Sequence, residues 1–309
     1  MPPDVAVVVA NYAGDEVLGP CLASVARQTY VPRETLVLDA GATENVASLA
    51  AAHGAEVLER PNRGVGYLYN EGARAARSPL VLLLNNDVVL DEHCVEHLAE
   101  ELERDPRRFA ADPRQLGLDG SLVHGLATLR RGPLLRQPLP GFRLDLRAPA
   151  DRPRPTVCAN GAAMLVRRDR LLELGGFDET MFMDFEDIDL CWRAWSRGWE
   201  SIHVPRATLS HRVGVATAEA DALAPRIRSS HHNLLRFALK CLPASAALRV
   251  TLGEVLRLPR HPALVGPALG RVGLELPEIL RLRRRIRPTG ALLRWMLDGQ
   301  PPGAQPVQP

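Results

Sequence analysis

The first hundred residues alternate between short apolar runs and stretches with the periodicity of amphipathic helices. Residues 5–10 form an unbroken apolar run, which is typical of a buried parallel strand. Residues 17–25 then place apolar side chains three and four positions apart, which predicts a helix. Strands that alternate with helices indicate an α/β fold with a mainly parallel central sheet and flanking helices. Further strands are predicted at 35–38, 55–58 and 80–84, and further helices at 46–53, 67–76 and 92–103.

The pattern is weaker between residues 106 and 155, which are rich in proline, glycine and arginine. We expect long loops with at most short edge strands there, and loops of this length inside a domain are usually functional. Regular elements are predicted to return afterwards. They are a strand at 161–166, a short helix that ends before Gly175, a helix at 186–197, and short strands at 201–204 and 208–209.

The chain changes character after His211. Residues 226–242 and 245–297 have the pattern of amphipathic helices, with arginines among leucines, and the last ten residues are rich in proline. We therefore expect an α/β domain over residues 1–215, a basic amphipathic helical extension over 216–298, and a disordered tail over 299–309.

Charge is distributed unevenly along the chain. From residue 226 onward the sequence has 14 basic and 4 acidic residues, about +10, which leaves 24 basic and 32 acidic residues, about −8, in the first 225. Lys240 is the only lysine, and we interpret the excess of arginine as GC-rich codon usage.

Cysteine usage and hydropathy indicate a cytoplasmic protein. The five cysteines are widely spaced and form no Cys-x-x-Cys pair, which argues against a disulfide framework or a structural zinc site. No signal peptide precedes the first apolar run, and no 18 consecutive residues are apolar, so no transmembrane helix is predicted.

Polar side chains follow four of the predicted strands, at the point where each strand ends. Asn11, Asp39, Asn62 and Asp87 occupy these positions. Open α/β sheets bind ligands at the carboxyl ends of their strands, and the glycine-containing turn at 60–66 opens a helix whose N-terminus suits a phosphate. A carboxylate after a buried strand is costly unless it holds a cation or accepts strong hydrogen bonds. Asp87 is therefore a candidate metal ligand.

A second acidic cluster lies about a hundred residues later. Asp184, Glu186, Asp187 and Asp189 fall within six residues, at the start of a predicted helix and among aromatic residues. A carboxylate in such partly dry surroundings has a raised pKa, which suits a general base.

Together these motifs resemble the family 2 inverting glycosyltransferases, which have the GT-A fold and use nucleotide-diphosphate sugars. The nearest branch is the rhamnosyltransferase-like group of bacterial polysaccharide synthesis. The resemblance covers residues 5–214. It depends on the residues Val8-Val9-Ala10-Asn11-Tyr12, Asp39, Asn62-Arg63-Gly64 with Asn70, Asn85-Asn86-Asp87, Gly161, Gly175-Gly176-Phe177-Asp178, Phe185-Glu186-Asp187-Ile188-Asp189-Leu190-Cys191-Trp192-Arg193, Gly198-Trp199, Pro205 and His211.

The resemblance implies a role for each matching residue. Asp187 would be the general base, with Glu186 and Gly161 on the acceptor side. Asp87 would bind Mg²⁺ or Mn²⁺ between the donor phosphates, with His211 as a second metal ligand. The donor pocket would contain Ala10, Asn11, Tyr12, Asp39, Asn62, Gly64, Asn70, Asn86 and Asp87.

The chemistry agrees with these roles. The leaving group is a nucleoside diphosphate, and a divalent ion neutralises the charge that grows on it. Mg²⁺ accepts few carboxylates when phosphate and water complete its shell, so a single acid at Asp87 is enough. The expected reaction transfers a sugar from a UDP- or dTDP-sugar to a hydroxyl of a glycan or lipid-linked acceptor, in cell-surface polysaccharide synthesis.

Three other interpretations remain open at this point. A nucleotidyltransferase would also bind a nucleotide on an α/β sheet, although residues 1–30 contain no lysine for a phosphate loop. A non-catalytic sugar-nucleotide-binding protein is compatible with Asn85, which stands where the family has the first acid of its metal motif. His211 is also compatible with an ordinary structural histidine.

The basic C-terminal part suggests an anionic partner. Amphipathic helices rich in arginine bind anionic membrane surfaces, which predicts peripheral binding to the inner face of the cell membrane. The alternative is a solvated charged surface, in particular for residues 281–287. No recognisable nucleic-acid-binding module accompanies the charge, so we expect no nucleic-acid partner.

Overall fold

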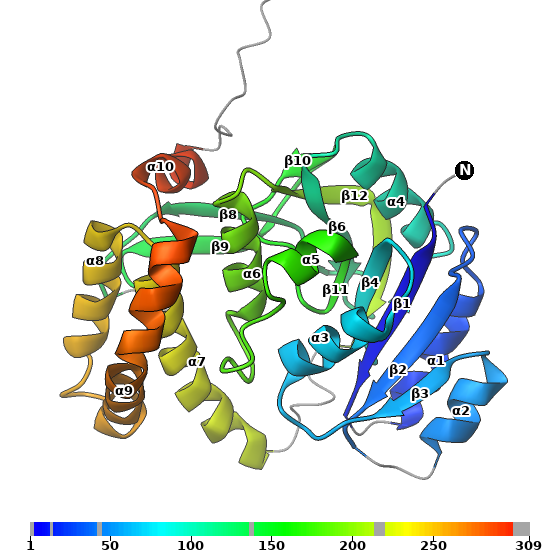
Figure 1. The fold of residues 1–309 in the computed structure, drawn as a ribbon, viewed down its shortest axis with the longest axis horizontal. Helices are drawn as coiled ribbons and strands as arrows, with labels where there is room; N and C mark the ends of the chain where they lie inside the picture. The colour runs from blue at the N-terminus through cyan, green and yellow to red at the C-terminus, as the bar shows by residue number, and fades with distance from the viewer. Residues whose placement is uncertain (1–2, 13–14, 42–44, 136–138, 213–219, 299–309) are drawn as a thin grey trace, which may run out of the picture.

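The computed structural model describes residues 3–12, 15–41, 45–135, 139–212 and 220–298. A central sheet crosses the molecule with helices on both sides, and four further helices lie beside it (Figure 1). The longest path through the sheet runs β10-β12-β6-β11-β4-β1-β2-β3. The strands of this path are β1 (Val5–Asn11), β2 (Glu34–Asp39), β3 (Glu56–Glu59), β4 (Leu80–Asn85), β6 (Arg108–Leu116), β10 (Arg154–Pro155), β11 (Ala163–Arg167) and β12 (Glu200–His211).

The predicted parallel sheet is confirmed in the N-terminal half. Strands β3, β2, β1 and β4 are parallel neighbours, and β11 pairs with β4 in the antiparallel direction. Alternate residues of β1 point to opposite sides, so that Val7 and Val8 belong to two separate apolar cores. Helices α1 (Asp15–Ala26), α2 (Val46–Ala52) and α4 (Cys94–Glu103) contribute to one core, and α3 (Val65–Ala75), α5 (Arg168–Glu173) and α6 (Glu186–Trp195) to the other.

The expectation of loops with short edge strands between residues 106 and 155 was wrong. Strand β6 has nine residues and lies inside the sheet, between β11 and β12. Strands β8 (Leu126–Arg131) and β9 (Phe142–Ala148) form a separate antiparallel pair. Short strands β5 (Val88–Leu90) and β7 (Leu122–His124) pair with β12 and β6. The two short strands expected at 201–204 and 208–209 are one strand, β12, with an irregular step between Val204 and Thr208.

The C-terminal part is helical, as predicted, but divided into more helices than expected. Helix α7 (Ala220–Cys241) is followed by α8 (Ala244–Val255), α9 (Pro262–Ile286) and α10 (Gly290–Asp298). Proline explains the start of α9, because Pro262 occupies its first turn, where a missing N–H costs nothing. None of these helices, nor any other in the described residues, is long and apolar enough to cross a membrane. The tail predicted at 299–309 lies outside the described residues.

Helix α7 shares a core with the α/β part of the chain. Phe237 packs edge-on against Trp192 of α6, with ring centroids 5.5 Å apart. Beside this contact, the buried Lys240 ammonium lies between the carboxylates of Asp178 and Asp189, with a distance of 2.8 Å from Nζ to Asp189 Oδ1. Arg236 also pairs with Asp178, at 2.8 Å. Because each buried charge has an opposite charge in contact, the cluster avoids the penalty of an isolated buried ion.

The two histidines of α7, His231 and His232, pair with carboxylates of the following helices. His232 is buried, and its Nε2 lies 2.8 Å from Glu275 of α9. His231 is partly buried and contacts Glu254 of α8. The carboxylates that accommodate them are 23 and 43 residues away in sequence, which explains why a local pattern could not indicate the burial.

Candidate active site

A chain of side-chain hydrogen bonds joins the carboxyl ends of three parallel strands. Asn86 Nδ2 donates to Asn11 Oδ1 at 2.7 Å, and Asn11 Nδ2 donates to Asp39 Oδ1 at 2.8 Å. The backbone N–H of Gly41 donates to the same carboxylate at 3.2 Å. Asn11, Asp39 and Asn86 are all buried. The structure thus brings together three of the residues that the sequence placed in a donor pocket.

Asp87 and His211 meet beside this chain. Asp87 is buried, and its Oδ1 has no hydrogen-bond partner within the described residues. His211 Nε2, at the end of β12, lies 3.3 Å from that oxygen. The two residues are 124 positions apart in sequence, and the pairing of β5 with β12 brings them together.

The neighbours of His211 indicate which of its two ring nitrogens faces a hydrogen-bond acceptor. The backbone N–H of Ala162 donates to Asn160 Oδ1, so this oxygen is an acceptor, and Gln115 Nε2 must be the donor to it at 3.0 Å. Gln115 Oε1 therefore faces His211 Nδ1, at 3.0 Å, and accepts its proton. In the neutral imidazole, Nε2 then points a lone pair at Asp87.

Two acceptors that face each other require a proton or a cation between them. Ligands at right angles, each about 2.1 Å from a divalent ion, lie about 3 Å apart, which is close to the observed distance from Asp87 Oδ1 to His211 Nε2. A histidine that donates its other N–H to a carbonyl oxygen is the usual arrangement in metal sites. Within the described residues no three His, Cys, Asp or Glu side chains converge as ligands. The pair therefore fits an ion that takes its remaining ligands from phosphate and water.

The candidate base Asp187 is fixed by two backbone N–H groups. Gly161 N–H donates to Asp187 Oδ2 at 3.0 Å, and Ile188 N–H donates to Oδ1 at 2.7 Å. Burial raises the pKa of Asp187 above the usual value, and the negative charge of Asp184 acts in the same direction, against the opposing effect of the two N–H groups. A raised pKa brings a carboxylate closer to the range of a general base.

The backbone just before Asp187 is strained. Asp184 and Phe185 both have positive φ angles, 69° and 71°, a conformation that costs a non-glycine residue about 1–2 kcal/mol. Asn233 of α7 holds this turn, since its Nδ2 donates to Met183 O at 2.7 Å and to Asp184 O at 2.8 Å. Such strain persists where the surroundings fix it, and here it sets the direction in which α6 begins.

The remaining predicted residues lie in varied positions. Ala10 is buried at the end of β1, whereas Tyr12 and Asn62 are exposed. Gly64 begins α3 with a φ of 96°, and a Cβ there would lie 2.4 Å from the Phe182 carbonyl oxygen. Glu186 is buried at the start of α6.

Asn70 supports the site from outside it. Its Oδ1 accepts from Phe177 N–H at 2.7 Å, and its Nδ2 donates to Phe177 O and to Glu179 Oε1, both at 3.0 Å. These contacts hold the loop after Gly176. In the structure Asn70 therefore binds this loop and is not joined to the chain that contains Asp39.

The sequence analysis did not predict a buried cluster in which one aspartate contacts two histidines. Asp112 Oδ2 lies 3.1 Å from His124 Nε2 and 3.0 Å from His203 Nδ1, and all three residues are buried. Asp112 Oδ1 also accepts from the N–H of Asn160, at 3.0 Å. Burial would lower the pKa of His124, but Asp112 raises it above the usual value. The residues come from three strands, β6, β7 and β12, so only the order of the sheet could have revealed them.

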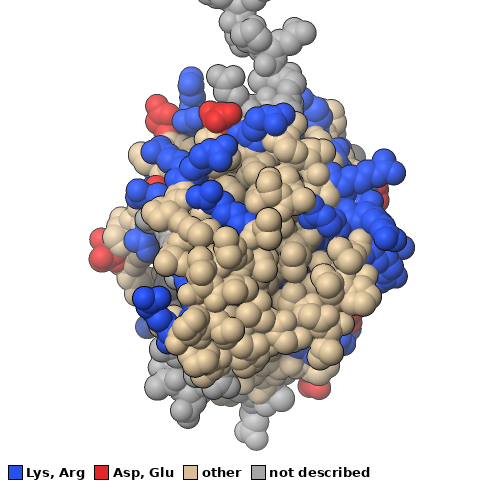
Figure 2. All heavy atoms as spheres, turned by 90° about the vertical axis from the view of Figure 1, so that its left-hand side faces the viewer, with Lys and Arg blue, Asp and Glu red and all other residues tan. Residues whose placement is uncertain are grey.

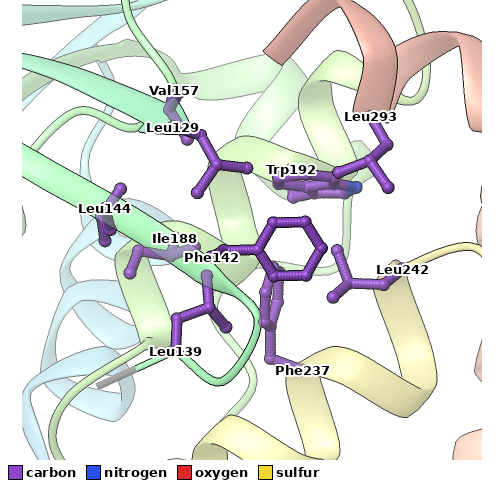
Figure 3. Close-up of a pocket in the computed structure, with 10 residues that line it drawn as sticks. All are labelled: Leu129, Leu139, Phe142, Leu144, Val157, Ile188, Trp192, Phe237, Leu242 and Leu293. Atoms are coloured by element: carbon purple, nitrogen blue, oxygen red, sulfur yellow. The ribbon is translucent and has the colours of Figure 1, made fainter. Parts of the chain in front are cut away.

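A small pocket lies beside α6 (Figure 3). Ile188 and Trp192 of α6 contribute to its wall, together with side chains from the β8–β9 pair, α7 and α10. Its lining is aliphatic and aromatic, so it offers no charged partner for a diphosphate. The nucleotide site is therefore expected at the strand ends and not here. The residues that line it are Leu129, Leu139, Phe142, Leu144, Val157, Ile188, Trp192, Phe237, Leu242 and Leu293.

Known proteins are similar to this chain in sequence and in fold. The family model described as glycosyltransferase like family 2 matches residues 2–231. The N-acetylglucosaminyl-diphospho-decaprenol L-rhamnosyltransferase of Mycobacterium tuberculosis is 30% identical over 242 residues, which cover 70% of this chain and 78% of that protein. The pre-mycofactocin glycosyltransferase of the same organism is 32% identical over 160 residues, covering 50% of this chain and 32% of the other.

Two solved structures are similar in fold. The structure of GalNAc-T7 with UDP, GalNAc and Mn²⁺ matches with a TM-score of 0.68 at 14% identity, over 96% of this chain and 56% of that longer one. The mannosyltransferase PcManGT of Pyrobaculum calidifontis, in complex with GDP-Man and Mn²⁺, matches with a TM-score of 0.56 at 16% identity, over 96% and 84%. The mixed α/β sheet, the strand-end site and these matches agree with the predicted fold and family. The chain belongs to the family 2 glycosyltransferases, with the GT-A fold.

Proposed function

We propose that this enzyme transfers a sugar from a UDP- or dTDP-sugar to a hydroxyl of a lipid-linked or glycan acceptor, with inversion and with help from a divalent metal. One observation carries the proposal. Asn160 Oδ1 accepts from Gln115, which orients His211 toward Asp87, and the N–H of the next residue, Gly161, holds Asp187. A diphosphate-binding pair and a candidate base are thus joined by one short run of hydrogen bonds.

The strand ends would bind the donor. In this proposal Asp39 contacts the nucleotide base. Asn11 and Asn86 keep the carboxylate of Asp39 in place through the hydrogen-bond chain. Asp87 and His211 would hold Mg²⁺ or Mn²⁺, which when bound neutralises charge on the leaving diphosphate. The Mn²⁺ bound in the two similar structures supports a metal of this kind.

Asp187 would accept the proton of the attacking hydroxyl. Its two N–H partners fix both oxygens, so that the carboxylate is oriented before the acceptor arrives. Glu186, adjacent in sequence, would lie on the acceptor side. A single displacement by a hydroxyl that one base activates inverts the configuration at the sugar carbon, which is why we assign an inverting mechanism.

The acceptor is proposed to be lipid-linked. The name of the rhamnosyltransferase relative describes an acceptor on diphospho-decaprenol, and that relative matches 70% of this chain. A reaction on such a substrate takes place at a membrane, so we propose that the enzyme works on its inner face, in the synthesis of a cell-surface polysaccharide.

The substitution Asp187→Asn tests the proposal. Donor binding, measured as the rise in melting temperature with UDP- or dTDP-sugars and Mn²⁺, should be retained, because Asp187 lies on the acceptor side. Turnover should fall by at least about 10²-fold, the lower range for loss of a general base. The exposed Asp151→Asn is the matched control and should keep wild-type turnover. Near-normal turnover of the Asp187→Asn variant would overturn the assignment, and NMR of the product would test inversion.

The same assay separates the other interpretations. A glycosyltransferase releases the free nucleoside diphosphate as it transfers the sugar, in a metal-dependent manner. A non-catalytic binding protein would raise its melting temperature with the donor but release no nucleotide. A nucleotidyltransferase would instead consume a sugar phosphate and a nucleoside triphosphate.

A further inference from the structure

Exposed apolar side chains gather on helices α8 and α9. Thirteen large hydrophobic residues are exposed in the described part of the chain, and seven of them lie between residues 248 and 280. On α8 and the residue that follows it, Leu248, Leu252, Val255 and Leu256 have the spacing of a single helical face. Scattered exposed leucines need no explanation, but a continuous stripe of them indicates a contact surface.

Helix α9 also presents exposed apolar side chains. Leu276 and Leu280 lie one helical turn apart and are both exposed, whereas Leu274, which is 86% exposed, lies on another side of the helix. Arg284 follows Leu280 by one further turn, so the apolar line on α9 ends in a cation. We call the α8 stripe together with Leu276 and Leu280, and the arginines around them, the α8–α9 face.

The charge around this face is one-sided. Among residues 243–298, eight arginines are exposed, against two exposed acids, Glu278 and Asp298. Glu278 already has a partner, because its Oε1 lies 3.1 Å from the buried Arg236. Figure 2 looks onto this side of the molecule and shows a broad area without charged groups, with many arginine and a few acidic side chains along its borders.

The α8–α9 face is firmly joined to the rest of the enzyme. Arg283 of α9 donates to the carbonyl oxygens of Leu239 and Leu242, at 2.7 Å and 2.6 Å. Glu275 of α9 contacts both His232 and Arg236 of α7. Helix α7 in turn holds the turn that precedes Asp187, so the orientation of the face also fixes the orientation of the site.

We propose that the α8–α9 face lies on an anionic lipid bilayer. The leucines would enter the boundary between headgroups and acyl chains, and the arginines around them would contact the phosphates. An anionic bilayer is the partner that offers both an apolar interior and a negative surface, and it matches this combination over a whole face. The inference rests on the proposed function in one respect: a lipid-linked acceptor is the reason for the site to lie beside a membrane.

Vesicle binding tests the proposal directly. The full chain should sediment with vesicles of phosphatidylcholine and phosphatidylglycerol, and much less with phosphatidylcholine alone. The double change Leu252→Asp with Leu280→Asp should weaken binding by at least about tenfold, because two apolar contacts are replaced by charges that repel the lipid. Leu118→Asp, at a leucine that is 71% exposed on another part of the chain, is the matched control.

A second pair of variants tests the charge. Arg281→Glu with Arg284→Glu should also reduce affinity by about tenfold or more, and higher salt should reduce the wild-type affinity. Arg27→Glu with Arg152→Glu, two exposed arginines elsewhere, should bind as wild type. Melting curves should show that all the variants are folded, since each changed side chain is exposed.

Three results would overturn the inference. They are a wild-type chain that does not bind anionic vesicles, α8–α9 variants that bind as well as wild type, and a face that joins two copies of the chain. The last would appear as a dimer in light scattering that the leucine variants dissociate. Measuring nucleotide release with a short water-soluble acceptor distinguishes a failure of the membrane inference from a failure of the proposed function. If release continues while vesicle binding fails, the proposed function stands and only the membrane inference falls.

Discussion

The substitution Lys240→Met should destabilise the enzyme strongly. Lys240 is the only lysine of the chain, and its ammonium is buried between Asp178 and Asp189. Methionine keeps most of the volume of the side chain but removes the charge. Asp178 would keep Arg236, and Asp189 would keep Arg193, at 2.7 Å. The variant would therefore lose one buried cation, which in the wild type contacts both carboxylates.

The magnitude follows from the burial of the cluster. Removing one partner of a buried ion pair costs about 3–5 kcal/mol, because the remaining charge stays buried. Unfolding entropy of about 2.1 cal/mol/K per residue gives about 0.65 kcal/mol/K for 309 residues. The melting temperature should therefore fall by about 5–8 °C at pH 7. Arg27→Met, at an exposed cation, is the control and should change it by less than about 1 °C.

The loss should depend on pH. Burial would raise the pKa of Asp178, but Lys240 and Arg236 lower it well below the usual value, and Lys240 and Arg193 likewise lower the pKa of Asp189. A depressed carboxyl pKa stabilises the folded state above the unfolded pKa of about 3.9, and this stabilisation is lost as pH falls through the folded value. In the variant the carboxylates protonate more readily, which removes part of the excess negative charge that the loss of Lys240 leaves.

Differential scanning calorimetry between pH 7 and about pH 2 provides the measurement. The difference between the wild type and the Lys240→Met variant should be largest at pH 7 and should narrow as pH falls below the unfolded carboxyl pKa of about 3.9. A melting temperature within about 2 °C of the wild type at pH 7, or a deficit that stays constant on acidification, would refute the reasoning. Either result would mean that Arg193 and Arg236 alone neutralise the cluster.

Four further outcomes follow from the site. Burial raises the pKa of Asp187, so turnover should fall as pH drops through an apparent pKa above the usual carboxyl value, measured under saturating donor. The change His211→Ala should raise the Mn²⁺ concentration needed for half-maximal activity by about tenfold or more, in a metal titration. Asn233→Ala should lower kcat by about tenfold or more with little change in donor KM, because the strained turn would relax. In urea unfolding, Gly176→Ala should destabilise the protein by at least about 2 kcal/mol more than Gly175→Ala. Both glycines have positive φ, but only a Cβ at position 176 would clash, 2.2 Å from the Oδ1 of Asn70.

The strand-end part of the site could be predicted from sequence. Asn11, Asp39 and Asp87 each follow a short apolar run, and the parallel direction of the strands brings such residues to one edge. The rule needs no knowledge of the loops. Asp187 could also be predicted as a candidate base, because an acidic cluster at a helix start among aromatic residues is a local pattern. Its role in this enzyme stays a prediction until the variant is measured.

The other half of the sheet could not be predicted in this way. Strand β6 contains Asp112 and Pro113 and two arginines, so its sequence lacks the apolar run that marks a buried strand. Its burial depends on His124 and His203, which supply the contacts for Asp112 from 12 and 91 residues away. A buried polar residue whose hydrogen-bond partners are distant in sequence cannot be distinguished from a loop residue by its sequence neighbours alone.

The irregular step in β12 explains how one strand serves two parts of the site. His203 faces Asp112 across the β6–β12 ladder, and His211 reaches Gln115 farther along. In a regular strand, residues eight positions apart point to the same side. The ladder skips residues 205–207, an odd number, so His211 and His203 point to opposite sides, as Gln115 and Asp112 do on β6. Without this step His211 would turn away from Asp87, and the candidate metal pair would not form.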